Sequence, residues 1–270
     1  MALSEGRATQ LGEGEAKAMT LSRYAMVGFW GTRQETPEAL ALRFNRLIDR
    51  LALIDPVLSN WIWINENRKP IQFARIHGQL AEKIAAAIAK ADDGEPVPIF
   101  GYRFGTLNVL GDTPRLFDLS IHAGSWIEND SFYSNKASLT TDYYAAPDPA
   151  IVTYKIFKQA LLAIAESFEV TFCAAFPNDL MDLWPKGQKF RFGWINYVSP
   201  RFAPLVTPPK SAFVEYRQNG GLLMAATDET FITSNPQHLA AARDIEAALA
   251  PLNALPWPLD EGADNASPLS

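Results

Sequence analysis

The chain has 270 residues, of which 48% are hydrophobic and 11% aromatic, and this share is sufficient for a sizeable core. Its formal net charge of −6 argues against broad binding of nucleic acid, which needs a basic surface to neutralise phosphates. A single cysteine, Cys173, excludes an internal disulfide and a multi-cysteine metal site.

The two ends of the chain differ in composition from its middle. Residues 1–21 are mostly small and polar, with no apolar core of a signal peptide, and residues 255–270 are rich in proline and small residues. No run reaches the roughly 18–20 apolar residues of a membrane span. We therefore expect a flexible N-terminal arm (1–21), one domain (22–254), a flexible C-terminal tail (255–270) and a cytoplasmic location.

The first half of the chain predicts one long helix, a second shorter helix and several strands. The apolar run 23–30 predicts a strand, and Thr36-Pro37-Glu38 then begins a helix with an N-cap hydroxyl, an early proline and an acid in the first turn. Helical spacing of apolar residues predicts the second helix over 73–89. Further strands are expected at 61–64 (or a packed loop there), 99–110, 115–123 and 137–144.

The second half of the chain likewise predicts isolated helices between strands. Asp148-Pro149 resembles the start signal of the first helix, and Asn235-Pro236 opens the last one. Strands are expected at 170–176, 190–198, 212–216 and 222–226. Because helices stand alone between runs of strands, the sequence predicts a single-domain α+β fold, with three to four helices packed on a largely antiparallel sheet.

Catalytic constellations are missing from the sequence. The histidines His77, His122 and His238 are far apart, and there is no zinc-protease motif, nucleophile elbow or phosphate-binding loop. Cys173 lies in an apolar run and is expected to be buried. The sequence predicts no catalytic residue, no cofactor and no bound metal, so we expect a protein that is not an enzyme.

Exposed aromatic and acidic residues are the better candidates for function. Trp126 lies in a polar loop, and an exposed tryptophan can anchor a protein interface. The acidic pairs Glu128/Asp130 and Asp179/Asp182 fall in predicted turns, where solvated carboxylates are common. Asp228 is expected to cap a turn.

Three stretches, taken in order, resemble the bacterial polymorphic-toxin immunity family numbered fifty-two. They are residues 28–38 (GFWGTRQETPE), 193–201 (GWINYVSPR) and 220–236 (GGLLMAATDETFITSNP), and their spacing covers about residues 22–250. Residues 95–145 carry no such signal.

The resemblance implies an immunity protein that binds and neutralises a co-inherited secreted toxin by stoichiometric inhibition. Such toxins are often DNases of restriction-endonuclease-like type, delivered by type VI secretion. The expected partner is the toxin, with no direct nucleic acid and no membrane. Inhibition could occlude the active site or block assembly of the toxin, and the alternative function is an adaptor or chaperone for a secreted effector.

The resemblance also separates two sets of residues. Its motif residues are expected to determine the fold: Trp30, Arg33, Glu35, Trp194, Tyr197, Arg201 and Asp228. Toxin binding is expected instead on Trp126, Glu128, Asp130, Asp179 and Asp182, because an acidic surface suits the basic groove of a nuclease.

Overall fold

The computed structural model describes residues 22–64, 69–110, 113–127, 135–141 and 146–255. The expected N-terminal arm, and all of the expected C-terminal tail except Leu255, lie outside these residues. Every strand in the described part of the chain belongs to one ten-stranded antiparallel sheet, in the order β3-β2-β4-β5-β6-β1-β7-β8-β10-β9. The α+β prediction is confirmed.

The helices of the described residues are α1 (Pro37–Ile54), α2 (Phe73–Ile76), α3 (Leu80–Ala86), α4 (Tyr154–Phe168) and α5 (Pro236–Asn253). The strands are β1 (Tyr24–Trp30), β2 (Trp61–Ile64), β3 (Pro70–Gln72), β4 (Tyr102–Leu110), β5 (Thr113–Ala123), β6 (Asn135–Thr141), β7 (Phe172–Pro177), β8 (Ile195–Val198), β9 (Phe213–Tyr216) and β10 (Leu222–Ala225). Of these helices, none has the length and apolar character to cross a membrane.

Helix α1 begins where the sequence predicts. The Thr36 hydroxyl accepts a hydrogen bond from the backbone N–H of Ala39 at 3.3 Å, and Pro37 occupies the first turn. The predicted second helix is instead divided, because a 3-10 turn over His77–Gln79 separates α2 from α3. This division brings the number of α-helices in the described residues to five.

The start of α4 was predicted five residues too early. The side chain of Asp148 accepts from the N–H of Ala150 at 2.8 Å, so Asp148-Pro149 forms a turn. Thr153 is the N-cap of α4 and accepts from the N–H of Ile156 at 3.3 Å. The predicted strand 190–198 is likewise shorter, because the Asn196 side chain accepts from the N–H of Gly193 at 3.0 Å and closes a local turn before β8.

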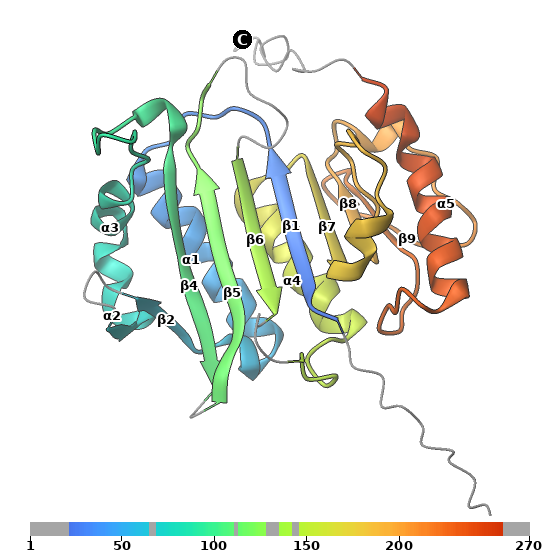
Figure 1. Cartoon of the computed structure of the whole chain (residues 1–270), viewed down its shortest axis with the longest axis horizontal. Helices are drawn as coiled ribbons and strands as arrows, with labels where there is room; N and C mark the ends of the chain where they lie inside the picture. The colour runs from blue at the N-terminus through green and yellow to red at the C-terminus, as the bar shows by residue number, and fades with distance from the viewer. Residues whose placement is uncertain (1–21, 65–68, 111–112, 128–134, 142–145, 256–270) are drawn as a thin grey trace, which may run out of the picture.

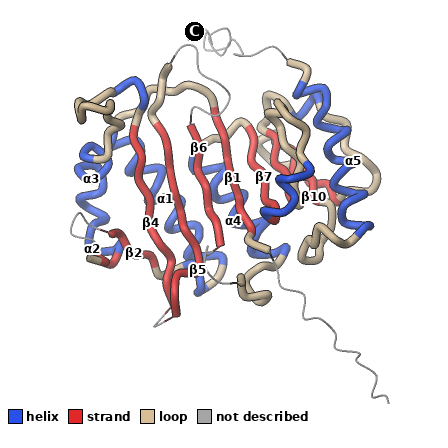
Figure 2. The backbone as a smooth tube through the Cα atoms, viewed as in Figure 1, coloured by secondary structure: helices blue, strands red, loops and turns tan. Residues whose placement is uncertain are grey.

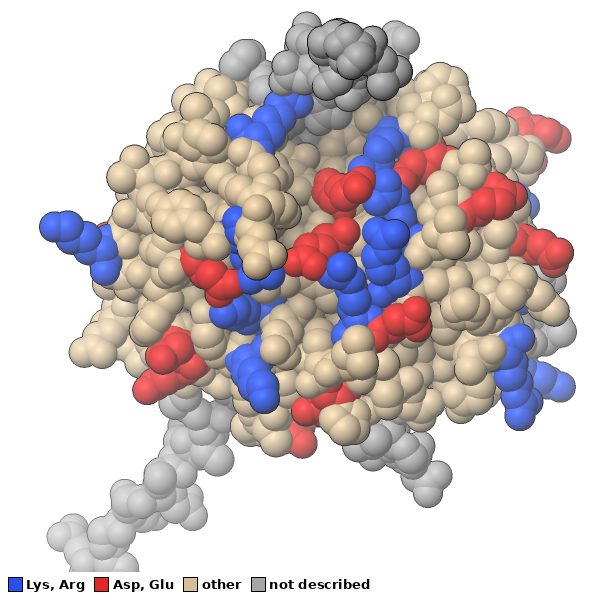
Figure 3. Space-filling model, turned by 180° about the vertical axis from the view of Figure 1, so that it is seen from behind, with Lys and Arg blue, Asp and Glu red and all other residues tan. Residues whose placement is uncertain are grey.

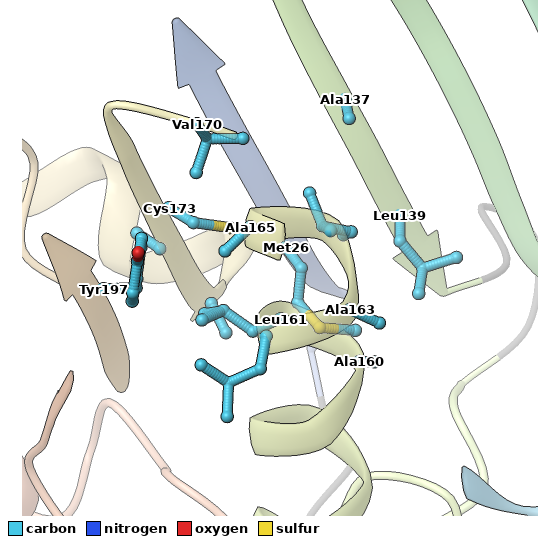
Figure 4. Close-up of a cluster of buried hydrophobic side chains, with 14 of the residues drawn as sticks. Met26, Ala137, Leu139, Ala160, Leu161, Ala163, Ala165, Val170, Cys173 and Tyr197 are labelled. Atoms are coloured by element: carbon cyan, nitrogen blue, oxygen red, sulfur yellow. The ribbon is translucent and has the colours of Figure 1, made fainter. Parts of the chain in front are cut away.

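Helices α1 and α4 cover one face of the sheet (Figure 1). From β1, Tyr24 packs edge-on against Phe157, and Trp30 stacks on Phe168 with ring centroids 5.1 Å apart. Figure 4 shows Met26 beside the same helix. Cys173 is buried as predicted, and burial raises the pKa of its thiol.

The opposite face is only partly covered. Over β7, Phe172 contacts Phe190 of the segment 184–192, and this segment is held to α5 through Asn253, whose side chain accepts from the N–H groups of Lys189 and Phe190. Over β4, β5, β6 and β1, no described helix lies on this face (Figure 2). The sheet therefore presents an open surface at one side of the molecule.

Candidate partner-binding surface

The open face, which we define as the uncovered side of β4, β5 and β6, begins with a basic row. Residues that pair directly across an antiparallel sheet point to the same side. Arg103 pairs with His122, and His122 pairs with Lys136. Arg103 and Lys136 are exposed and form no ion pair with a described residue. A row of basic groups therefore crosses three strands of an acidic protein.

Small residues occupy the next row of the open face. Gly105 pairs with Ser120, and Ser120 pairs with Ser138. Beside them lies a hollow of about 560 Å³, which is lined by Trp63, Ile64, Gly105, Thr106, Leu107, Asp118, Leu119, Ser120 and Thr140. Since this row lacks bulky side chains, a partner can approach the sheet closely.

Two exposed aromatic residues, Phe100 and Trp126, form the rim of the open face. Trp126 is 38% exposed and Phe100 is 43% exposed. The N–H of Trp126 donates to the carbonyl oxygen of Ile99 at 3.1 Å, so the two segments are neighbours. The ring Nε2 of His122 lies 2.8 Å from the carbonyl oxygen of Phe100, which links the rim to the basic row. Large, partly exposed aromatics of this kind anchor protein interfaces.

Phe100 was not identified from the sequence because it was placed inside a strand. The structure puts Phe100 at the end of a 3-10 turn, and β4 begins only at Tyr102. Gly101 between them has φ +69, and a Cβ there would lie 2.4 Å from the carbonyl oxygen of Ala123. The glycine was a usable signal for this break.

A buried asparagine ties the rim to the first family motif. The Asn135 side chain accepts from the N–H of Ser125 at 2.9 Å and donates to the carbonyl oxygen of Gly31 at 2.6 Å. The N–H of Arg33 donates to the carbonyl oxygen of Ser125 at 2.8 Å. The loop that carries Trp126 is thus held by residues 31–33.

The predicted toxin-binding residues do not form one patch. Strands β1 and β5 run in the same direction because both are antiparallel to β6, and Trp126 follows the end of β5. Asp179 accepts from the hydroxyls of Ser22 and Thr233 at 3.1 and 2.8 Å, just before the start of β1. Asp179 and the exposed Asp182 therefore lie at the opposite end of the strands from Trp126. Glu128 and Asp130 lie outside the described residues.

Most motif residues make contacts inside the fold. Trp30 is buried, and Trp194 is buried with its Nε1 donating to the carbonyl oxygen of Thr227 at 2.9 Å. Tyr197 is also buried; its hydroxyl accepts from Asn219 at 3.3 Å, and burial raises its pKa.

Two motif residues, Arg201 and Asp228, are exposed. The Arg201 guanidinium lies over the Phe202 ring, 5.4 Å from its centroid. The turn after β10 is capped by the Thr227 hydroxyl, which accepts from the N–H of Glu229 at 3.1 Å. The expectation that Asp228 caps this turn is not borne out by these contacts.

Glu35 and Arg33 belong to an ion-pair cluster. Figure 3, which shows the molecule from behind relative to Figure 1, has basic and acidic side chains gathered side by side on that face. The Glu35 carboxylate, only 6% exposed, contacts Arg43 at 2.6 Å and Arg33 at 3.1 Å. Arg33 also donates to the carbonyl oxygen of Phe168 at 2.8 Å. Burial lowers the pKa of Arg33, and the Glu35 carboxylate opposes this shift. Glu169 completes the cluster.

A second cluster links Arg50, Lys158, Glu166, Glu215 and Arg217. Its charges are mutually paired, which suits a structural role better than proton transfer. Of the residues with described positions, no three His, Cys, Asp or Glu side chains are arranged to hold a metal ion.

The cluster around Glu35 allows a matched test. Glu35→Gln removes a nearly buried carboxylate between two guanidinium groups, so we expect the free energy of unfolding to fall by about 2 kcal/mol or more. Glu169→Gln changes the 64%-exposed acid of the same cluster and should cost less than about 1 kcal/mol. Urea denaturation measures both, and equal losses would contradict the structural role of Glu35.

Comparison with known proteins identifies a family. The family model described as Immunity protein 52 matches residues 22–255. A search of curated proteins found no match. Among solved structures, the chain is similar to the Pseudomonas aeruginosa T6SS protein PA0821, with 14% sequence identity and a TM-score of 0.48, over 86% of this chain and 73% of that one. Because the family model covers nearly all of the described residues, the chain belongs to the Immunity protein 52 family.

Proposed function

We propose that this protein neutralises a cognate secreted toxin by binding it stoichiometrically through the open face and its rim. The family match over residues 22–255 is the observation that carries the antitoxin role. The alternative, an adaptor or chaperone for a secreted effector, also requires a protein-binding surface. The two functions differ in whether the bound toxin keeps its catalytic activity.

The uncovered part of the sheet is the proposed position of the interface. The buried side of the sheet is closed by α1 and α4, and part of the other side is closed by α5 and the segment 184–192. No described helix covers the open face, which carries aromatic residues at its rim and basic residues beside them. Aromatic anchors surrounded by polar groups are typical of tight interfaces.

A nuclease is the class of toxin that the charges favour. The net charge of −6 attracts a basic substrate groove over a distance and increases the rate of encounter. At contact, the basic row can pair with carboxylates, which nucleases use to hold a catalytic metal ion. We further propose type VI delivery and a cytoplasmic site of action, as the family resemblance implied. We also propose that the acidic residues predicted from the sequence, Glu128, Asp130, Asp179 and Asp182, contribute to the attraction of the toxin.

The first experiment measures DNA cleavage by the C-terminal domain of the toxin from the neighbouring gene. An equimolar amount of this protein should abolish cleavage and form a stable complex, because protection requires an affinity on the order of nM. Binding with full cleavage would favour the adaptor function. Absence of any complex would contradict the proposed function.

A second experiment locates the interface. Trp126→Ala and Phe100→Ala should each weaken toxin binding by about 30-fold, since a buried aromatic anchor contributes about 2 kcal/mol. Leu42→Ala is the control, because Leu42 is 69% exposed on α1, outside the open face. Isothermal titration calorimetry measures the affinities, and an unchanged thermal midpoint verifies folding. Rim variants that bind as tightly as the Leu42 variant would place the interface elsewhere.

A further inference from the structure

The two edges of the sheet differ in what they expose. At one edge, β3 is three residues long and contains Pro70, which has no N–H to offer to a new strand. At the other edge, β9 exposes three large apolar or aromatic side chains out of four residues. Phe213 is 49% exposed, Val214 is 39% exposed and Tyr216 is 71% exposed. Such an edge is a template for pairing with another strand.

The backbone of β9 has a defined outward side. Among described strands, β9 pairs only with β10. The N–H of Arg217 donates to the carbonyl oxygen of Gly221 at 2.8 Å, which fixes the alternation of the antiparallel ladder. The backbone N–H and C=O groups of Phe213 and Glu215 therefore point toward β10, whereas those of Val214 and Tyr216 point away from the sheet.

Ion pairs hold this edge in place. Glu215 contacts Lys158 of α4 at 2.5 Å, and Arg217 contacts Glu166 of α4 at 3.4 Å. Glu215 and Arg217 also pair with each other. Because β9 is already fixed to the helix layer, pairing with another strand costs little ordering entropy.

We propose that β9 pairs antiparallel with β9 of a second copy of this chain, on a two-fold axis at Val214. In this register Val214 faces the partner's Val214, Phe213 faces the partner's Glu215, and Tyr216 faces the partner's Ala212. The small alanine leaves room for the tyrosine ring, and no like charges stand opposite each other. The N–H of Ala212 donates to the carbonyl oxygen of Pro209 at 3.2 Å, so each Tyr216–Ala212 pair adds one ladder bond, from the Tyr216 N–H to the Ala212 carbonyl oxygen.

Other two-fold registers are less favourable. In the register that overlaps all four residues, Val214 lies opposite Glu215 of the second copy. The backbone groups of Val214 point outward and those of Glu215 point toward β10, so the ladder cannot form. An axis at Glu215 sets two carboxylates directly opposite each other, which is destabilising. An axis at Tyr216 requires Gln218 to pair, but Gln218 lies in the turn closed by the hydrogen bond from Gly220 N–H to Arg217 C=O.

The dimer should be weak and dependent on concentration. Stable interfaces bury about 800 Å² on each partner, and a four-residue strand supplies less. Like net charges also repel, so added salt should favour the dimer. In the sheet order, β9 lies at the end away from β4, β5 and β6, so the dimer leaves both open faces free. This inference does not depend on the proposed function.

Engineered cysteines test the register in the full chain. In a hydrogen-bonded antiparallel pair the Cα atoms lie about 5.5 Å apart, which permits a disulfide. The native Cys173 does not compete because it is fully buried. Under mild oxidation Val214→Cys should form a cross-linked dimer in several-fold higher yield than Tyr216→Cys or the surface control Leu42→Cys. Equal yields would overturn the proposal, and a maximum at Glu215→Cys would overturn its register.

Sedimentation equilibrium tests the dimer without oxidation. The wild type should associate as its concentration rises, and Val214→Pro should raise the dimer dissociation constant at least tenfold. Proline removes only an outward N–H, so the ladder to β10 stays intact. If circular dichroism shows that the proline variant is unfolded, Val214→Lys is tested in its place. A charged lysine on an edge strand opposes pairing with another strand. A wild type that stays monomeric, or variants that associate as well as it does, would overturn the proposal.

Discussion

The packing of β1 against α4 is the contact on which the rest of the structure depends. Strand β1 lies between β6 and β7, and its alternate residues Tyr24 and Trp30 pack on Phe157 and Phe168. Gly28 permits this approach, because a Cβ there would lie 3.0 Å from the side chain of Ile164 in α4. Once α1 and α4 occupy one side of the sheet, the other side of β4, β5 and β6 is available for a partner.

The fold motif and the open face are physically connected. Residues 31–33 follow β1 and hold the loop of Trp126 through Asn135 and Ser125. Residues 31–33 therefore position the rim. The family model matches residues 22–255, so the expectation that residues 95–145 carry no family signal is not borne out. Under the proposed function, the fold motif holds the surface that recognises the toxin, and a few interface residues can set the difference in affinity between one toxin and another.

Local sequence signals predicted the elements better than their arrangement. The burial of Cys173 followed from an apolar run, and the cap at Thr36 followed from residue type. The start of α4 was predicted wrongly at Asp148-Pro149, because the same residue types are favoured in turns and at helix starts. The separation of Trp126 from Asp179 could not be predicted, because it depends on β1 pairing with β6 and β7, which are distant in sequence.

Amide hydrogen exchange of the toxin complex tests the central claim most directly. Binding through the open face and its rim should slow exchange in residues 97–108, 117–127 and 135–141, relative to the free protein. Exchange in α1 and α4, which lie behind the sheet, should change little. Protection confined to α1 and α4, with the segments of the open face unchanged, would contradict the account.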